Sequence, residues 1–236
     1  FKVYKDNQEF MWEPLAVRSL GSYTTTQNLY KNRYGNKIIF EEINHDLELI
    51  FRYQWSSSNV FGFVKKSKLI NTGNEAVKVC LLDGIQNIMP ASIGSDEQNQ
   101  SSNLVDAYKR NELEEATGLG IFALSAILVD KAEASEALRA NIVWSLGLEN
   151  PKHLLSSLQL NDFRLGKSLE QEVDVKAEKG AYFLTTDIFL EKGASKEWMI
   201  VANVHQNHSN IAKLSKQIRE DSSLLEKVNN DINLGT

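Results

Sequence analysis

Cysteine and proline are scarce in this chain: Cys80 is the single cysteine, and only three prolines occur among 236 residues. One cysteine excludes an internal disulfide and a cysteine-based zinc site. No apolar run reaches the roughly 18–20 residues that a membrane-spanning helix needs. Basic residues are not in excess either, since 26 Lys and Arg face 31 Asp and Glu for a net charge of −5. The sequence therefore predicts neither a membrane protein nor a nucleic-acid binder.

The hydrophobic content, 42%, supplies a sizeable core and excludes wholesale disorder. The length suits one large domain or two small ones. The chain begins at Phe1 without an initiator methionine. We therefore expect either a processed chain or a piece of a longer protein. The compartment stays open between cytoplasm and periplasm, and a bacterial origin is expected.

Two-residue periodicity is the clearest pattern. Apolar side chains alternate with other residues from Leu47 to Trp55, which predicts a strand with one apolar face. Strands flank it on both sides and form a predicted meander over 37–83. The other predicted strands cover 119–129, 136–146, 180–191 and 198–204, although the pattern at 136–146 also fits a helix.

Helices are fewer. We predict an exposed loop over 92–103, a short helix over 103–113 and a second helix beginning at Asn150-Pro151. A stripe formed by Ile211, Ile218, Leu225 and Ile232 predicts one terminal helix of roughly 20 residues, capped by Ser209 or Asn210. That stripe needs a partner surface, either on this domain or on another one. The fold class is mainly β: a large antiparallel β-sandwich over 1–208 and a helical tail over 209–236.

Histidines and carboxylates give weak signals. His205 and His208 are three residues apart, but no acidic or cysteine ligand lies nearby in the sequence, so we predict no metal site and no cofactor. Paired carboxylates are the signature of glycoside chemistry. Glu41 and Glu42 are adjacent on a predicted strand and must point to opposite faces, so they cannot flank one bond. The pairs Asp96-Glu97 and Glu114-Glu115 are expected to be solvated.

Aromatic residues are more suggestive, because their rings can stack on sugars. Trp55, Trp144 and Trp198 are in phase with apolar strand faces, so we assign them to the core. Trp12 has no such periodicity and is the tryptophan best placed for a surface or interdomain contact.

Two segments carry more polar side chains than a plain strand or helix needs. Gln86 and Asn87 stand between Gly84 and Pro90 at the end of an apolar strand, where loops often build sites. Asp106, Lys109 and Arg110 can form ion pairs on a helix face together with Glu112. The candidate ligand contacts are therefore Trp12, Gln86, Asn87, Asp106, Lys109 and Arg110, and none of them is assigned a catalytic role.

These segments, with Trp12–Arg18, Asn28–Gly35 and Ala134–Ala140, resemble the N-terminal region of cellobiose-phosphorylase-like proteins of the glycosyltransferase 36 or glycoside hydrolase 94 type. The resemblance implies a β-supersandwich similar to galactose mutarotase, a helical linker and an (α/α)6 barrel that holds the catalytic aspartate. The tail over 209–236 is then the start of the linker, its stripe covered by the barrel. No catalytic residue carries over to this chain.

Three functions remain open. The first is a non-catalytic, carbohydrate-associated domain that shapes an active site, forms a dimer interface, or both. The second is an autonomous mutarotase-like epimerase, which needs a histidine and a carboxylate in one concave pocket. The third is a pure assembly module without sugar binding. The expected partners are the barrel of the same polypeptide, a saccharide and a second copy of the chain.

Overall fold

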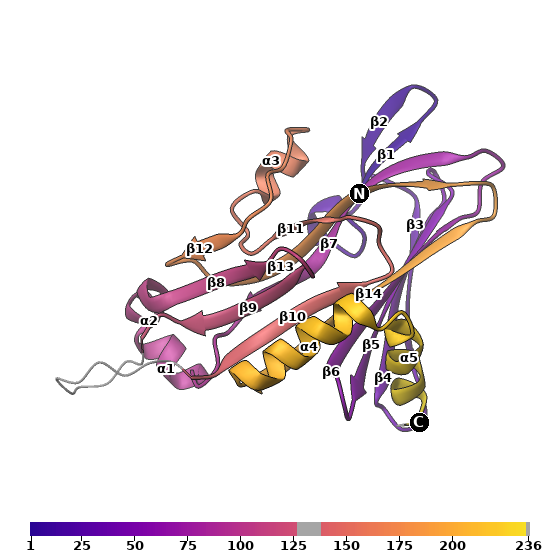
Figure 1. Cartoon of the computed structure of the whole chain (residues 1–236). Helices are drawn as coiled ribbons and strands as arrows, with labels where there is room; N and C mark the ends of the chain where they lie inside the picture. The colour runs from indigo at the N-terminus through magenta and orange to yellow at the C-terminus, as the bar shows by residue number, and fades with distance from the viewer. Residues whose placement is uncertain (127–137, 235–236) are drawn as a thin grey trace.

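Two antiparallel sheets pack face to face in the computed structural model, which describes residues 1–126 and 138–234 (Figure 1). The smaller sheet has five strands: β1 (Lys2–Lys5), β2 (Gln8–Met11), β7 (Val77–Ile88), β11 (Lys152–Leu154) and β13 (Gly180–Leu190). Its spatial order is β11-β13-β7-β1-β2. Every paired strand in the described residues is antiparallel to its neighbour, and this arrangement confirms the predicted mainly β sandwich.

The larger sheet has nine strands. They are β3 (Thr25–Lys31), β4 (Lys37–Asn44), β5 (Leu49–Ser58), β6 (Gly62–Asn71), β8 (Lys109–Glu114), β9 (Leu119–Leu124), β10 (Ala140–Leu146), β12 (Asp174–Lys176) and β14 (Ser195–Gln206). Their spatial order is β12-β8-β9-β10-β14-β6-β5-β4-β3. The predicted meander is β4, β5, β6 and β7, although β7 leaves the large sheet for the small one.

Period-two alternation explains the core. On β5, Leu49 and Phe51 face the small sheet and are buried, whereas Arg52, the next residue after Phe51, is exposed. Leu69 of β6 and Trp198 of β14 join them from the same sheet, and Leu81 of β7 meets them from the other. Burial of each such large apolar side chain contributes about 1.5–3 kcal/mol.

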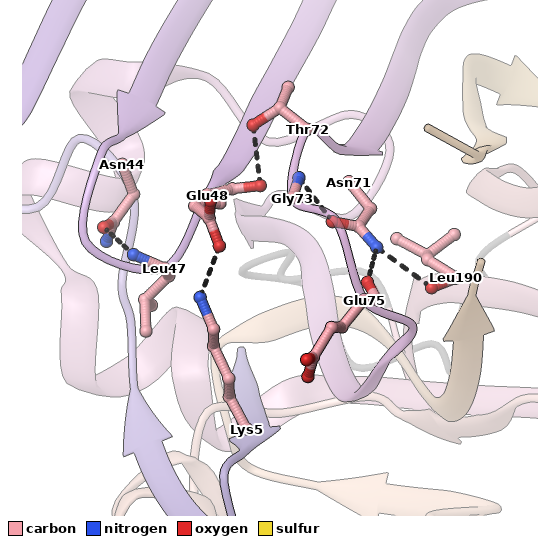
Figure 2. Close-up of polar contacts among 9 residues, drawn as sticks. All are labelled: Lys5, Asn44, Leu47, Glu48, Asn71, Thr72, Gly73, Glu75 and Leu190. Carbon is pink, nitrogen blue, oxygen red and sulfur yellow. Dashed lines mark hydrogen bonds and ion pairs between the residues drawn. The ribbon is translucent and has the colours of Figure 1, made fainter. Parts of the chain in front are cut away.

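The polar residues at one end of the sandwich hold its turns together (Figure 2). The Asn71 side-chain nitrogen donates to the carbonyl of Glu75 at 2.7 Å and to that of Leu190 at 3.1 Å. Lys5 Nζ reaches Glu48 at 2.6 Å. These contacts tie the turn after β6 to the end of β13, and β1 to the turn before β5.

The middle of the chain differs from the prediction. Residues 92–103 are not one exposed loop, because they contain α1 (Ser95–Gln100) and the start of α2 (Ser102–Tyr108). The helix predicted over 103–113 is wrong in its second half, where β8 begins at Lys109. Lys109, Asn111 and Leu113 are buried in alternation there, which is the period of a strand.

The helix predicted at Asn150-Pro151 is also wrong. Lys152–Leu154 form β11, whose residues pair with Phe183–Thr185 of β13. The helix that follows is α3 (Leu160–Arg164), which is shorter and starts ten residues later. Leu154 and Leu155, at the end of β11 and just after it, are both fully buried.

The tail forms two helices rather than one. Helix α4 (His208–Glu220) begins after Asn207, whose side chain accepts a hydrogen bond from the Asn210 backbone. Asp221 ends it, because its carboxylate accepts hydrogen bonds from the Ser223 backbone and hydroxyl and so favours a turn. Helix α5 (Leu224–Leu234) follows.

The apolar stripe of the two helices has its partner surface within this domain. Leu224, Val228 and Ile232 are buried against the outer face of the large sheet, with Trp144 and Val201 among their neighbours. The expectation that a missing barrel covers the stripe is therefore wrong (Figure 1). Leu225, one of the residues used to predict the stripe, is 42% exposed instead.

The strand predicted over 136–146 is confirmed as β10 from Ala140 onward. Residues 127–129, the end of the strand predicted over 119–129, lie outside the described residues. So do residues 134–137, part of a segment that carries the family resemblance, and residues 235–236. In the part of the chain that the structure describes, no helix is long and apolar enough to cross a bilayer.

Candidate ligand cavity beside strand β7

A cavity of about 730 Å³ lies along the second half of β7. Strand β1 pairs with β7 only through Lys78–Cys80, so residues 82–88 have no strand partner on that side within the described ranges. On the other side β13 approaches closely: a Cβ on Gly84 would lie 2.3 Å from the Tyr182 carbonyl oxygen. The glycine lets β13 pack closely on that side, and the open strand edge on the other side leaves room for a ligand.

One wall of the cavity is aromatic. Tyr53 and Trp55 of β5 and Phe63 of β6 line it, and all three belong to the face of the large sheet that looks toward the small one. Phe63 is 56% exposed, and Phe40 stacks on Tyr53 with ring centroids 4.9 Å apart. Burial and then the charge of Asp83 raise the pKa of Tyr53, so its hydroxyl stays protonated near neutral pH. Flat apolar rings of this kind can stack on a sugar ring.

The floor of the cavity holds a buried ion pair. Asp83 accepts a short hydrogen bond from Lys65 Nζ, which also donates to the Gly84 carbonyl at 3.1 Å. The second carboxylate oxygen of Asp83 accepts from Ser67 Oγ at 2.9 Å and from Trp198 Nε1 at 2.7 Å. Both oxygens are therefore engaged by groups of the protein itself.

The rim carries a second ion-paired carboxylate. Arg164 Nε of α3 donates to Glu13 Oε1 at 2.7 Å, although the two residues are 151 positions apart. Arg18, in the 3-10 turn Val17–Ser19, has its Nε 3.3 Å from Glu13 Oε2. Glu13 thus joins the loop after β2 to α3 at the mouth of the cavity.

Gln86 and Asn87 line the same cavity, as expected of residues at the end of an apolar strand. Gln86 Nε2 donates to Ser157 Oγ at 3.1 Å, which leaves its side-chain oxygen to accept. Asn87 has a positive φ of 57°, a conformation that asparagine tolerates better than most residues. Both side chains offer polar atoms beside the aromatic wall.

Trp12 is not a surface residue, and this prediction is wrong. Its indole is fully buried in the main core, beside Phe1 and below the loop that carries Glu13. Trp12 Nε1 donates to Glu42 Oε1 at 2.7 Å. A buried donor with a buried acceptor holds the fold together and is out of reach of a ligand. Trp55, assigned to the core, is instead half-buried and lines the cavity.

Asp106, Lys109 and Arg110 lie elsewhere and do not line the cavity. Lys109 is buried and its Nζ contacts Asp106 at 2.7 Å and Gln98 Oε1 at 2.7 Å. Burial alone raises the pKa of Asp106, but the hydrogen bond and charge of Lys109 outweigh it and hold that pKa below its usual value. Arg110 pairs with Asp174 of β12 across two strands. These contacts fasten α2 and the edge of the large sheet.

The adjacent carboxylates Glu41 and Glu42 point to opposite faces, as predicted. Glu42 caps Trp12, and Glu41 accepts hydrogen bonds from Asn28 and Arg52 on the outer face. Burial raises the pKa of Glu41, but these bonds outweigh it and leave the pKa below its ordinary value. Both carboxylates are structural.

No histidine lines the cavity in the described residues, so the pair of groups that an epimerase needs does not meet there. Within the same ranges, no three His, Cys, Asp or Glu side chains gather as a metal-ligand set.

The sequence pattern did not identify four of the residues that line the cavity: Lys65, Phe63, Glu13 and Arg164. Phe63, Lys65 and Ser67 are spaced by two along β6 and therefore lie on one face of the strand. Their partners in the cavity are distant in sequence, so the local pattern could not identify them as site residues.

The sequence matches no protein-family model and no curated protein. Among solved structures, the chain is similar to part of a bacterial glucoamylase complexed with acarbose. The TM-score is 0.48 at 9% identity, covering 88% of this chain and 27% of that one. A polysaccharide lyase gives 0.47 at 12% identity, covering 92% and 27%.

A GH36 α-galactosidase from Geobacillus stearothermophilus in complex with stachyose gives a TM-score of 0.35 at 8% identity, covering 86% of this chain and 30% of that chain. The chain therefore spans less than a third of the length of each of these three structures.

Proposed function

We propose that this chain is a non-catalytic, carbohydrate-binding β-sandwich domain and that the cavity beside β7 receives the sugar. The observation that carries the proposal is one cavity in which aromatic rings, Tyr53, Trp55 and Phe63, stand beside the polar side chains Gln86 and Asn87. A sugar ring presents an apolar face and a belt of hydroxyls, and such a cavity complements both.

The ion pairs support the non-catalytic part of the proposal. General acid–base catalysis on a glycosidic bond needs a carboxyl group that can exchange a proton with the substrate. Asp83 has both oxygens bound by Lys65, Ser67 and Trp198, and Glu13 is held between two arginines. Both carboxylates are therefore engaged by side chains of the protein itself.

The sequence resemblance to cellobiose-phosphorylase-like proteins extends the proposal. On this basis the domain works beside a helical barrel in a longer polypeptide and forms one wall of its active site. The exposed apolar residues Val17 (82% exposed) and Leu20 (66% exposed), next to the cavity rim, are suited to pack against such a neighbour. The same proposal includes a domain boundary near residue 208 and the pairing of two copies of the chain in a homodimer.

The test is a thermal-shift screen of the chain with glucose, cellobiose, laminaribiose, galactose and phosphate, followed by calorimetry on the best ligand. A bound sugar raises the melting temperature according to RT ln(1 + [L]/Kd). Phe63→Ala should weaken binding by up to about tenfold, since an aromatic contact contributes roughly 0.5–1.5 kcal/mol beyond the area that it buries.

Phe189→Ala is the matched control, because Phe189 is similarly exposed at 64% and lies outside the cavity. It should leave the affinity unchanged. Equal loss in both variants would place the sugar elsewhere, and no shift with any saccharide would overturn the proposal in favour of an assembly module.

A further inference from the structure

We propose that the cavity beside β7 prefers an acidic saccharide, one that carries a carboxylate as a uronic acid does, over its neutral counterpart, and that Arg18 recognises this carboxylate. The inference rests on the proposed function, because it names the class of sugar for the same cavity.

The charges along the cavity are the first observation. The charged side chains that line the cavity in the described part of the chain are three cations and two anions, a local sum of +1: Glu13, Arg18, Lys65, Asp83 and Arg164. The whole chain has a net charge of −5. The cavity is thus a positive site on an acidic protein, and a bound anion gains from the local charge while the rest of the surface repels it.

Two of the three cations are already committed. Lys65 is buried, and its ammonium group is used by Asp83 and the Gly84 carbonyl. Arg164 directs Nε and Nη2 to Glu13 at 2.7 and 3.4 Å and Nη1 to Asn161 at 2.8 Å. Their donors are therefore satisfied within the protein.

Arg18 is the cation with spare donors. Its side chain is 60% exposed, and Glu13 Oε2 lies 3.3 Å from its Nε. Within residues 1–126 and 138–234, its terminal amino groups meet no acceptor. Glu13 is shared with Arg164, so one carboxylate faces two guanidinium groups.

A planar guanidinium with free N–H groups matches a carboxylate in a two-pronged arrangement. The ring of the same sugar can lie on Trp55 or Phe63, which line the same cavity. A neutral sugar keeps the stacking contact but gives Arg18 no charge to pair with. Recognition of the acid group therefore adds to the stacking rather than replacing it.

The experiment is calorimetric titration of the chain with pairs of disaccharides that differ only in oxidation at C6. The probes are α-1,4-galactobiose against α-1,4-digalacturonate, and cellobiose against its uronate. We expect the acidic member of the better pair to bind about tenfold more tightly at low salt, since a charge-assisted hydrogen bond contributes more than a neutral one. The ratio should shrink in 0.5 M NaCl, because salt screens an exposed pair.

Variants separate recognition from general electrostatics. Arg18→Gln should bring the two members of the pair to equal affinity, and Arg18→Lys should restore part of the preference. Arg33→Gln removes the same charge from the exposed turn between β3 and β4 and should keep the preference.

The outcomes also separate the two proposals. Equal affinity for acidic and neutral sugars, or a preference that survives Arg18→Gln, overturns the acidic-sugar inference while carbohydrate binding stands. Failure of every sugar to bind overturns the proposed function, and the inference with it.

Discussion

Trp198 and Asp83 join the two sheets of the sandwich: the indole Nε1 on β14 donates a 2.7 Å hydrogen bond to the carboxylate on β7. The same carboxylate accepts from Lys65 and Ser67 of β6, so three donors from the large sheet converge on one acceptor of the small sheet. This network lies at the cavity floor, since Lys65 and Asp83 both line the cavity. It fixes the distance between the aromatic wall and β7.

Asp83→Asn should destabilise the chain by about 3 kcal/mol or more, because it leaves the Lys65 ammonium group buried without a counter-charge. Urea unfolding at neutral pH measures the loss. Lys65→Met combined with Asp83→Asn should recover part of it. Asp187→Asn is the control and should cost much less, since the Lys78–Asp187 pair is half exposed and screened by solvent. Similar losses in the two single variants would contradict the assigned role.

Trp12→Phe should lower the free energy of unfolding by about 1–3 kcal/mol, because Glu42 loses a buried donor. It should not change the affinity for a sugar, since the indole does not reach the cavity. Trp55→Ala should affect stability less than Trp12→Phe does, and it should clearly weaken sugar binding. Chemical unfolding and calorimetry on both variants test the pair, and a sugar affinity that depends on Trp12 would refute the assignment.

Much of the sandwich can be predicted from local pattern. The alternation from Leu47 to Trp55 predicts β5 and its buried face because a strand turns successive side chains to opposite sides. The same reasoning correctly separates Glu41 from Glu42. It also selects Gln86 and Asn87, whose position at the end of a buried strand places them at the cavity.

Partners that are distant in sequence could not be predicted in this way. Trp12 has no local periodicity, and its burial depends on Glu42, 30 residues away on another strand. Glu13 and Arg164 meet across 151 positions. Asp221 interrupts an apolar stripe that otherwise continues, because its side chain competes for backbone donors. Such contacts follow from sheet register and loop path, and a local pattern contains neither.

Leu224→Ala should cost about 2–5 kcal/mol, because the side chain is 1% exposed and packs against the large sheet. Leu225→Ala is the matched control one residue away, where the side chain is 42% exposed, and should cost about 1 kcal/mol or less. Thermal and urea unfolding measure both. Equal effects would mean that α5 does not pack on the sheet in solution, and that its stripe serves another partner.

His153 should make the domain less stable in mild acid. The side chain is 7% exposed, and Nε2 has no hydrogen-bond partner among the described residues. It lies against Gly118, where an added Cβ would be 2.5 Å from Nε2 and where φ is +71°. Burial lowers the pKa of His153, and a hydrogen bond with Gln171 opposes that effect without cancelling it.

The sign follows from linkage. Because the folded-state pKa lies below the unfolded value near 6.5, the unfolded chain binds a proton first as the pH falls. The stability that neutral His153 contributes is fully present above the unfolded-state pKa. It is lost as the pH falls from there through the folded-state pKa. Urea unfolding at pH 7.5 and 5.5 should show a smaller decline for His153→Gln than for the unchanged chain. His45→Gln, at an exposed turn, should decline like the unchanged chain, and a steeper decline in His153→Gln would reverse the assignment.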